Sequence, residues 1–442
     1  MRKIPFQVKA GTTIYASTGR FGLNQPDRMS SEQFYLADAG SRIRLLDKTY
    51  FFNVATYTLE FDARYLHTYD YAPEESWTTY AQDLDGDTYR QEDYVFEDCR
   101  YFRICLKRVD GRAFTVAEAQ RINDILEYCS NAQPDTQRAV FQPEVIRAAQ
   151  EVQKLREQDD LVFAVLTDTH RTVNGTWAAT AANLQAVQQA VGLDAVLHLG
   201  DLTDGIVSRE LTMYYVQAML RDMQQTGVPV HVVLGNHDAN YFQGNPDVMP
   251  LDEQVRLYQK QSEDSKQEKA LPYYFIDYPE KRLRIILLSA YENDAEPRYG
   301  FDLPQIDWLQ KVLCQTPAGY KLLLFAHDAP LAELDFWSEV IRNGDRLMQV
   351  LEAHQQKQGN ILGYIHGHTH ADAVCCKHAF PIISIGCAKC EDMMEKKPPE
   401  SLTEKRRLGT ISQELWDILL VKPAAGKMEF IRFGAGHNRS VN

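Results

Sequence analysis

The chain has 442 residues, 44% of them hydrophobic and 24% charged, and its formal net charge is −14. This length predicts two globular domains. The acidic balance argues against a general nucleic-acid-binding protein, which needs a basic surface to contact phosphates. No apolar run approaches the roughly 18 residues of a membrane span, which argues against a transmembrane protein.

The first ten residues carry a basic pair, Arg2-Lys3, with no apolar stretch after it. We therefore predict no signal peptide and expect a cytoplasmic protein. A cell-surface location is the alternative if a leader has been removed from this sequence. The eight cysteines show no disulfide framework, which also fits a reducing compartment.

Residues 1–130 are predicted to form a mainly-β accessory domain. Short aromatic and β-branched runs, separated by turn-prone stretches, are typical of a β-sandwich; they are Thr49–Phe52, Thr56–Phe61, Tyr94–Phe96 and Tyr101–Leu106. We expect one helix, from Val116 to Tyr128. Thr115 is a plausible N-cap for it, and Glu118 follows three residues later, as in a capping box.

Residues 131–158 are predicted to be a linker that contains a helix. The stretch 130–142 is polar and carries Pro134, which marks the domain boundary. Pro143 is expected at the first position of a helix over 144–157, where proline is well tolerated.

Residues 159–442 alternate between apolar runs and amphipathic stretches, which predicts an α/β layered domain. Strands are predicted at 161–167, 194–199, 228–234, 282–289, 320–326 and 360–366. Helices are predicted at about 176–191, 208–225, 304–315 and 334–356. Two closing antiparallel strands are expected at Leu415–Val421 and Met428–Phe433.

Five short motifs follow predicted strand ends in this second domain. They are Asp168-Thr169-His170, Gly200-Asp201-Leu202-Thr203-Asp204, Gly235-Asn236-His237-Asp238, His327 and Gly367-His368-Thr369-His370. The carboxyl ends of strands are where open α/β sheets collect their ligands. The motifs offer imidazole nitrogens and carboxylate or amide oxygens, which suit Mn, Fe or Zn.

The spacing inside two motifs suggests how side chains converge. Residues two apart on an extended chain face the same way, so Asp168 and His170 could hold one ion, and His368 and His370 repeat this arrangement. Gly367 allows a close approach of the chain. Asp201, with two carboxylate oxygens, could bridge two ions.

This motif set resembles the calcineurin-like metallophosphoesterase family over roughly residues 160–375. The resemblance implies a layered β-sandwich flanked by helices that holds two metal ions. It implies that Asp168, His170, Asp201 and His370 bind the first ion. Asp201, Asn236, His327 and His368 would bind the second. His237 matches the catalytic histidine of the family, which is not a ligand, and Asp204 matches the acid that orients it.

The resemblance implies a phosphoesterase mechanism. Two cations about 3.5–4 Å apart lower the pKa of a bridging water, so that hydroxide can attack the phosphorus near neutral pH. His237, protonated and held by Asp204, would donate a proton to the leaving oxygen. We favour small phosphodiester or nucleotide-like substrates. A phosphomonoesterase or a nuclease of the same family is the alternative, although the acidic charge disfavours a nuclease.

Several residues near the motifs have alternative interpretations. His198 and His231 lie within apolar strands and are expected to be packed core residues. His366 could support the site but is more simply structural, and Asp238 and Asp328 are expected to support ligands or cap helices. Arg171 could contact a substrate phosphate or be a solvated loop residue. Cys375, Cys376, Cys387 and Cys390 could be imagined as a zinc site, but the adjacent pair is poor geometry and buried thiols are favoured.

The N-terminal aromatic residues leave a third class of function open. Trp77, Tyr80, Tyr89 and Tyr94 could line a glycan-binding groove, although such residues are more often core. On that interpretation the protein would bind carbohydrate or the cell envelope, and its metal domain would be vestigial.

Overall fold

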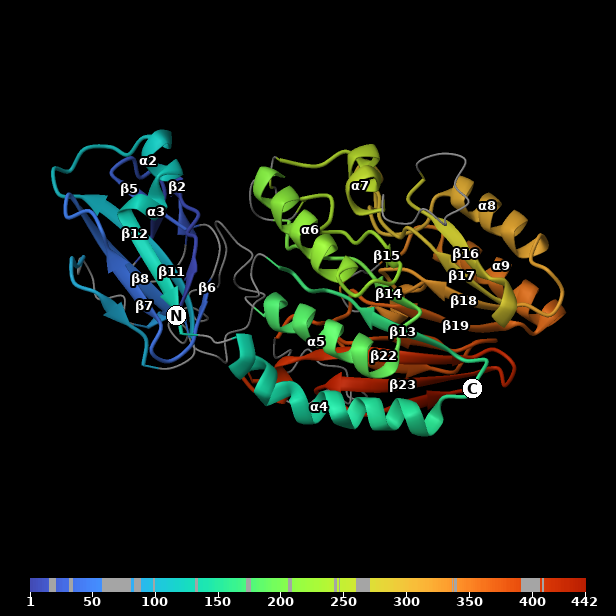
Figure 1. Cartoon of the computed structure of the whole chain (residues 1–442). Coiled ribbons are helices and arrows are strands. Elements are labelled where there is room, and N and C mark those ends of the chain that lie inside the picture. Colours follow the sequence, from blue (N-terminus) through green and yellow to red (C-terminus); the bar gives the residue numbers. More distant parts are fainter. Residues whose placement is uncertain are drawn as a thin grey trace. The chain divides into compact units, whose positions relative to one another are not determined.

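The structure is a computed structural model of the whole chain (Figure 1). It describes residues 1–442 except 16–20, 32–34, 58–80, 83–88, 98–99, 132–133, 172–175, 206–208, 242–244, 246, 260–270, 336, 338–339, 391–405 and 408. The described residues form two compact units. The first comprises Met1–Val140, Thr172–Ala179 and Arg407–Thr410, and the second comprises Phe141–Arg171, Thr180–Arg406 and Ile411–Asn442.

The first unit is mainly β, as predicted. One sheet has the order β1 (Arg2–Ile4), β12 (Leu126–Ser130), β7 (Arg42–Leu45) and β10 (Tyr94–Val95). A second has the order β2 (Lys9–Ala10), β5 (Arg28–Ser30), β11 (Arg100–Arg108), β8 (Tyr50–Tyr57) and β9 (Ala81–Gln82), and β6 (Tyr35–Ala37) also pairs with β11. Strands β3 (Thr13–Ile14) and β4 (Phe21–Gly22) form a separate pair.

An aromatic cluster forms the core of this unit. The ring of Phe102 lies 5.0 Å from that of Tyr128 and 6.3 Å from that of Phe6, both edge-on. Edge-to-face contacts of this kind add to the stability gained by burying the rings.

The helix predicted at 116–128 is wrong over residues 126–128, which belong to a strand. The capping box of Thr115 and Glu118 is present and starts α2 (Val116–Gln120), which is followed by α3 (Ile122–Ile125). Residues 126–130 then form β12, which pairs with both β1 and β7. Burial alternates along β12 with the period of two that a strand requires.

The linker helix begins earlier than predicted. Helix α4 runs over Pro134–Leu155, so Pro143 lies inside the helix and not at its first position. A proline there removes one backbone hydrogen bond.

The second unit contains two six-stranded sheets. The first has the order β15 (Val230–Val232), β14 (Ala195–His198), β13 (Leu161–Leu166), β22 (Leu415–Lys422), β23 (Lys427–Gly434) and β24 (Arg439–Val441). The second has the order β16 (Tyr274–Tyr278), β17 (Leu283–Leu287), β18 (Lys321–Phe325), β19 (Ile361–His366), β21 (Ile382–Ser384) and β20 (Ala373–Cys375). Strands β13, β14 and β15 are parallel, as are β17, β18, β19 and β21.

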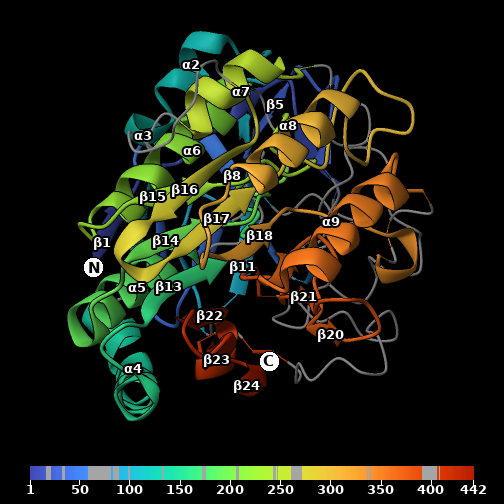
Figure 2. The same cartoon turned by 90° about the vertical axis from the view of Figure 1, so that its right-hand side faces the viewer.

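The two sheets pack face to face, with helices outside. Phe163 and Leu419 of the first sheet share one buried cluster with Ile285 and Phe325 of the second. The outer face of the second sheet packs against α8 (Leu303–Cys314) and α9 (Gly344–Gln358), which are seen beside it in Figure 2. Helices α5 (Trp177–Val191), α6 (Arg209–Gln224) and α7 (Leu251–Tyr258) lie on the side of the first sheet. The predicted layered α/β architecture is therefore confirmed.

One predicted helix of this unit begins too early. The prediction placed a helix at 334–356, but α9 begins at Gly344, and only a short 3-10 turn, η3, covers Ala332–Leu334. Two other 3-10 turns are η2 (Pro279–Lys281) and η5 (Ile411–Gln413). None of the helices in the described part of the chain has the length and apolar character needed to cross a bilayer.

Candidate metal centre

The seven predicted ligands follow five strands of the second unit. Asp168 and His170 follow β13, Asp201 follows β14 and Asn236 follows β15 in the first sheet. His327 follows β18, and His368 and His370 follow β19, in the second sheet. The parallel strands of each sheet bring their carboxyl ends to one edge, and at this edge the structure brings all seven side chains together.

The backbone at these positions is not the extended chain that the sequence suggested. Asp168, His170 and Asp201 have φ of 52°, 43° and 55°, in the left-handed region. His368 and His370 have φ of 62° and 58°. Non-glycine residues pay a steric cost there, and such residues concentrate at functional sites. The side chains of each pair therefore converge by sharp turns and not by strand alternation.

The first group of ligand atoms consists of Asp168, His170 and His370. His370 Nε2 lies 3.2 Å from Asp168 Oδ1 and 3.3 Å from His170 Nε2. His170 Nε2 lies 3.8 Å from Asp168 Oδ1 and also 3.8 Å from Asp201 Oδ2. One cation could therefore contact all four residues, which is the first predicted ligand set.

The second group is centred on His327. Its Nε2 lies 3.2 Å from Asp201 Oδ2 and 3.1 Å from Asn236 Oδ1. Asp201, His327 and His368 also have ligand atoms within 4.8 Å of one another. This is the second predicted set, and Asp201 belongs to both.

Hydrogen bonds leave one ligand atom on each of these residues for a cation. Asp168 Oδ2 accepts from the backbone N–H of His368 and from Thr167 Oγ1, while buried Oδ1 makes no hydrogen bond. Asp201 Oδ1 accepts from His237 N, while Oδ2 makes none. His327 Nδ1 donates to Leu199 O at 2.8 Å, so its Nε2 lone pair faces the centre. Buried polar atoms without partners are costly unless something else binds them, so the donor set fits a cation.

Electrostatics favour neutral His170 and His368 and a positive charge at the centre. Burial lowers the pKa of His170 to about 3 and that of His368 to about 4, so both are neutral at pH 7. Burial alone would raise the pKa of Asp168, but the imidazoles of His370 and His327 hold it well below its ordinary value. Burial opposes protonation of His327, yet the carboxylates of Asp201 and Asp168 raise its pKa well above the ordinary value. A positive charge is thus stabilised where a metal ion would lie.

His237 lies beside this centre, at 3.8 Å from Asp201 Oδ2 through Nε2. Its Nδ1 donates to the backbone carbonyl of Asp204 at 2.6 Å. The prediction gave the orienting role to the Asp204 acid, whereas this bond runs through the main chain. It leaves Nε2 facing the centre.

Asp238 supports the ligand loops, as expected. It is buried, and its carboxylate accepts from the backbone N–H groups of Asp201, Leu202 and Gly235. Gly367 permits the expected close approach, because a Cβ there would overlap Thr167 and lie 2.7 Å from Asp168 Oδ2.

Asp328 and Asp335 surround His368. Asp328 Oδ1 lies 3.4 Å from its Nδ1, and Asp335 Oδ2 lies 3.6 Å from its Nε2. Neither Asp328 carboxylate oxygen makes a hydrogen bond in the described structure. Asp335 was missed because the sequence placed it in a helix, whereas it lies in the loop before α9.

Lys389 is a second residue that the sequence did not single out. It is only 1% exposed, and its charge contributes to the lowered pKa of His170 and His237, after burial. Its backbone N–H donates to Asp168 O, and Arg406 donates to the carbonyls of Cys387 and Ala388. The loop 386–390 is therefore fastened beside Asp168, although no motif in the sequence marked it.

The histidines that were expected to be structural residues near the motifs are buried. Buried His198 accepts from Gly200 N through Nδ1, and its Nε2 lies 3.1 Å from Thr169 Oγ1. His231 is also buried, and His366 Nδ1 donates to Gly367 O. The guanidinium of Arg171 lies 5.1 Å from the ring centre of Tyr215, so it packs on α6.

The N-terminal aromatic residues and the cysteines give no further site. Trp77 and Tyr80 lie outside the described residues. Tyr94 packs edge-on against Phe96 at 4.9 Å, and Tyr89 lies under Lys107 at 4.2 Å, so neither supports a glycan groove. The four groups of candidate metal-ligating residues among the described parts of the chain contain no cysteine.

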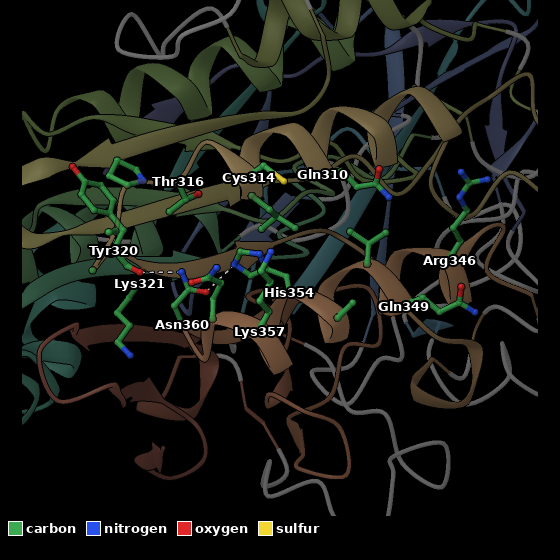
Figure 3. A pocket seen from close by; sticks show the side chains of 17 residues that line it. Gln310, Cys314, Thr316, Tyr320, Lys321, Arg346, Gln349, His354, Lys357 and Asn360 are labelled. Atoms are coloured by element: carbon green, nitrogen blue, oxygen red, sulfur yellow. Dashed lines mark hydrogen bonds between the residues drawn. The ribbon is translucent and has the colours of Figure 1, made fainter.

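A cavity of about 870 Å³ lies between α8 and α9 (Figure 3). Lys321 at the start of β18 and Asn360 before β19 line it, and Asn360 Oδ1 lies 2.9 Å from His354 Nε2. It is therefore at the opposite strand ends from His327 and His368.

Residues 161–372 match the family model of calcineurin-like phosphoesterases. This part of the chain is a calcineurin-like phosphoesterase domain. No curated protein matches the sequence. Among solved structures, a dimetal phosphatase from Danio rerio is 16% identical, covers 64% of this chain and 98% of its own, and gives a TM-score of 0.48. A phosphopantetheinyl hydrolase from Mycobacterium tuberculosis is 12% identical, covers 52% and 91%, and gives 0.33.

Proposed function

We propose that the protein is a metal-dependent phosphoesterase that hydrolyses small phosphodiester or nucleotide-like substrates. The observation that carries this proposal is the convergence of buried, unpaired Asp168 Oδ1 and Asp201 Oδ2 with imidazole nitrogens of the phosphoesterase domain. We assign Asp168, His170, Asp201 and His370 to one ion, and Asp201, Asn236, His327 and His368 to a second.

Two bound ions would supply a water of lowered pKa and neutralise charge on the phosphate. The residues of the chain then have separate tasks. Asp201 holds the two ligand groups together, because its Oδ2 is near both His170 and His327. The Asp238 carboxylate keeps the Asp201 loop in place, because it accepts from the backbone N–H groups of Asp201 and Leu202.

We assign the proton transfer to His237. Its Nδ1–H is engaged by the Asp204 carbonyl, so Nε2 is the atom that faces the reacting phosphate and can protonate the leaving oxygen. Burial lowers the pKa of this imidazole, which makes it a ready proton donor once charged.

The test is turnover after reconstitution with Mn, Fe, Zn or Mg, using a nitrophenyl phosphate monoester and a bis-nitrophenyl diester. We expect hydrolysis with at least one metal and faster hydrolysis of the diester. His237→Ala should keep its metal and lose turnover. If the protein binds two ions by calorimetry but hydrolyses neither ester, the proposed function is wrong.

A further inference from the structure

A hairpin over Tyr291–Gly300 carries the feature that the proposed mechanism does not use. Tyr291 and Tyr299 form an antiparallel bridge, and the N–H of Glu292 donates to Arg298 O at 3.0 Å. Arg342 anchors the hairpin, since its guanidinium pairs with Glu292 and its N–H donates to Tyr299 O at 2.9 Å. The backbone of Arg298 is therefore held in one place.

The base of the hairpin lies against the metal centre. The ring of Tyr299 lies 5.2 Å from that of His368 and 5.6 Å from that of Tyr291. Burial raises the pKa of Tyr291 to about 12, and the negative charge of Asp201 contributes to that shift. The hairpin is thus close to both a predicted ligand and the shared carboxylate.

The side chain of Arg298 packs on a residue of another loop. Its guanidinium carbon lies 3.7 Å from the ring centre of Tyr241. Tyr241 follows His237 by four residues, across a turn in which Asn240 N donates to His237 O at 2.9 Å. Arg298 therefore joins the hairpin, whose Tyr299 packs on His368, to the loop that follows His237.

The charge of Arg298 is not neutralised within the described residues. No ion pair joins it to a carboxylate there, in contrast to Arg284, which pairs with Asp277, and Arg432, which pairs with Asp372 and Asp417. It is also only partly buried. A guanidinium fixed on an aromatic ring and open to solvent is suited to bind carboxylate or phosphate.

We propose that Arg298 binds an anionic group on the leaving portion of the substrate, so that the preferred esters release a carboxylate-bearing or phosphate-bearing alcohol or acid. The leaving side is assigned because Arg298 packs on Tyr241, which ends the turn that begins at the proposed proton donor His237. The inference rests on the proposed function.

The experiment compares three matched esters on the Mn-loaded full-length protein: phenyl phosphate, 4-carboxyphenyl phosphate and 1,4-phenylene bisphosphate. We expect kcat/KM for at least one of the two anionic esters to exceed that for phenyl phosphate about tenfold or more, as for one charge-assisted hydrogen bond. Arg298→Gln should abolish this ratio and Arg298→Lys should reduce it. Arg256→Gln is the control, because Arg256 pairs with Asp252 on the exposed face of α7.

The outcomes separate the ligand classes. A preference for the carboxylate ester alone, or for the bisphosphate alone, identifies the anion, and equal preferences indicate recognition of charge. A wild-type protein without preference, or an Arg298→Gln protein that keeps it, overturns the proposal while leaving phosphoesterase activity intact.

A binding measurement covers failure of the hydrolase assignment itself. If no ester is hydrolysed, calorimetry with phenylphosphonate and 4-carboxyphenylphosphonate tests Arg298 alone. Tighter binding of the carboxylated compound to wild type than to Arg298→Gln supports the role of Arg298. Equal affinities, or no binding of either compound, overturn it.

Discussion

The two units of the chain differ in their buried carboxylates, which among the described residues occur only in the second unit. In the N-terminal unit, buried hydroxyls pair with one another or with the backbone, as Thr12 does with Ser30 and Ser31 does with Ile104 N. In the phosphoesterase domain, Asp168, Asp201 and Asp328 keep buried oxygens without hydrogen bonds. Satisfied polar groups stabilise a fold, whereas converging unsatisfied ones indicate a ligand. The difference predicts that changes in the second unit affect chemistry and changes in the first affect stability alone.

The largest effect is expected for Asp201→Ala. Because this carboxylate belongs to both ligand groups, its loss should reduce bound metal from two ions to one or none. Loss of several kcal/mol of transition-state stabilisation would lower turnover by about a thousandfold. Metal analysis and kcat/KM measure both results. Exposed Asp307→Ala on α8 is the control, and two ions retained in Asp201→Ala would contradict the shared role.

Next comes His237→Ala, for which we expect kcat to fall about a hundredfold on alkyl phosphate esters and less on nitrophenyl esters, which need no proton. Metal stoichiometry should be unchanged. Asp204→Asn should have a smaller effect, since the backbone carbonyl that orients His237 remains. A uniform loss across leaving groups would argue against His237 as the acid.

A smaller effect is expected for Asp328→Ala. Removing the group beside His368 Nδ1 should weaken metal binding about tenfold, as for other residues that orient ligands. Asp328→Asn keeps a polar group of the same size and should lose less. Calorimetric titration with Mn compares the variants, and equal affinities in wild type and Asp328→Ala would show that Asp328 does not orient His368.

Lowering the pH should reduce the stability of the second unit more than that of the N-terminal unit. Burial lowers the pKa of His198 to about 3 and that of His366 to about 4, so the unfolded chain binds more protons below its ordinary histidine pKa of about 6.5. The stability that these two neutral histidines contribute is complete above a pH of about 6.5. It is lost progressively as the pH falls toward 4. Of twelve histidines, only His67 precedes residue 141.

Hydrogen exchange at pH 7 and pH 5, corrected for intrinsic rates, measures this effect. We expect protection to fall in β13–β19 and to change less in β7, β8 and β11. Equal losses in both units would contradict the assignment of acid sensitivity to the buried histidines.

The smallest effect on turnover is expected for Phe102→Ala. Removing this fully buried ring should cost about 3–5 kcal/mol in the N-terminal unit. Protection in β8 and β11 should fall, while kcat/KM of the phosphoesterase domain stays within about twofold. A large loss of turnover would show that the N-terminal unit takes part in catalysis.

The sequence predicted eight strands of the second unit because each is a short apolar run, but it did not predict β16, β20 or β24. The prediction from sequence failed where the same residue pattern fits both a helix and a non-helical segment. Leu126–Ser130 continues an amphipathic helical pattern but pairs with β1 and β7 as a strand. The helix predicted from residue 334 begins only at Gly344.

The candidate site was predictable as a set of residues but not as a geometry. The motifs named all seven of the side chains that converge at the strand ends, since each follows a strand. The left-handed backbone at Asp168 and His370 has no sequence signal, because glycine is absent from both positions. Asp335 and Lys389 adjoin His368 and Asp168 from loops whose partners are distant in the chain, so no local pattern could reveal them.

The five left-handed ligand positions have one more consequence. Without an ion, the turns at 168–170 and 368–370 carry the steric strain of their left-handed backbone, so local opening should begin there. Hydrogen exchange of their backbone amides would then report the fraction of the protein that carries metal. Exchange at these few sites should slow in proportion to the fraction of protein that carries metal, and it could be read in a crude extract before any substrate is known.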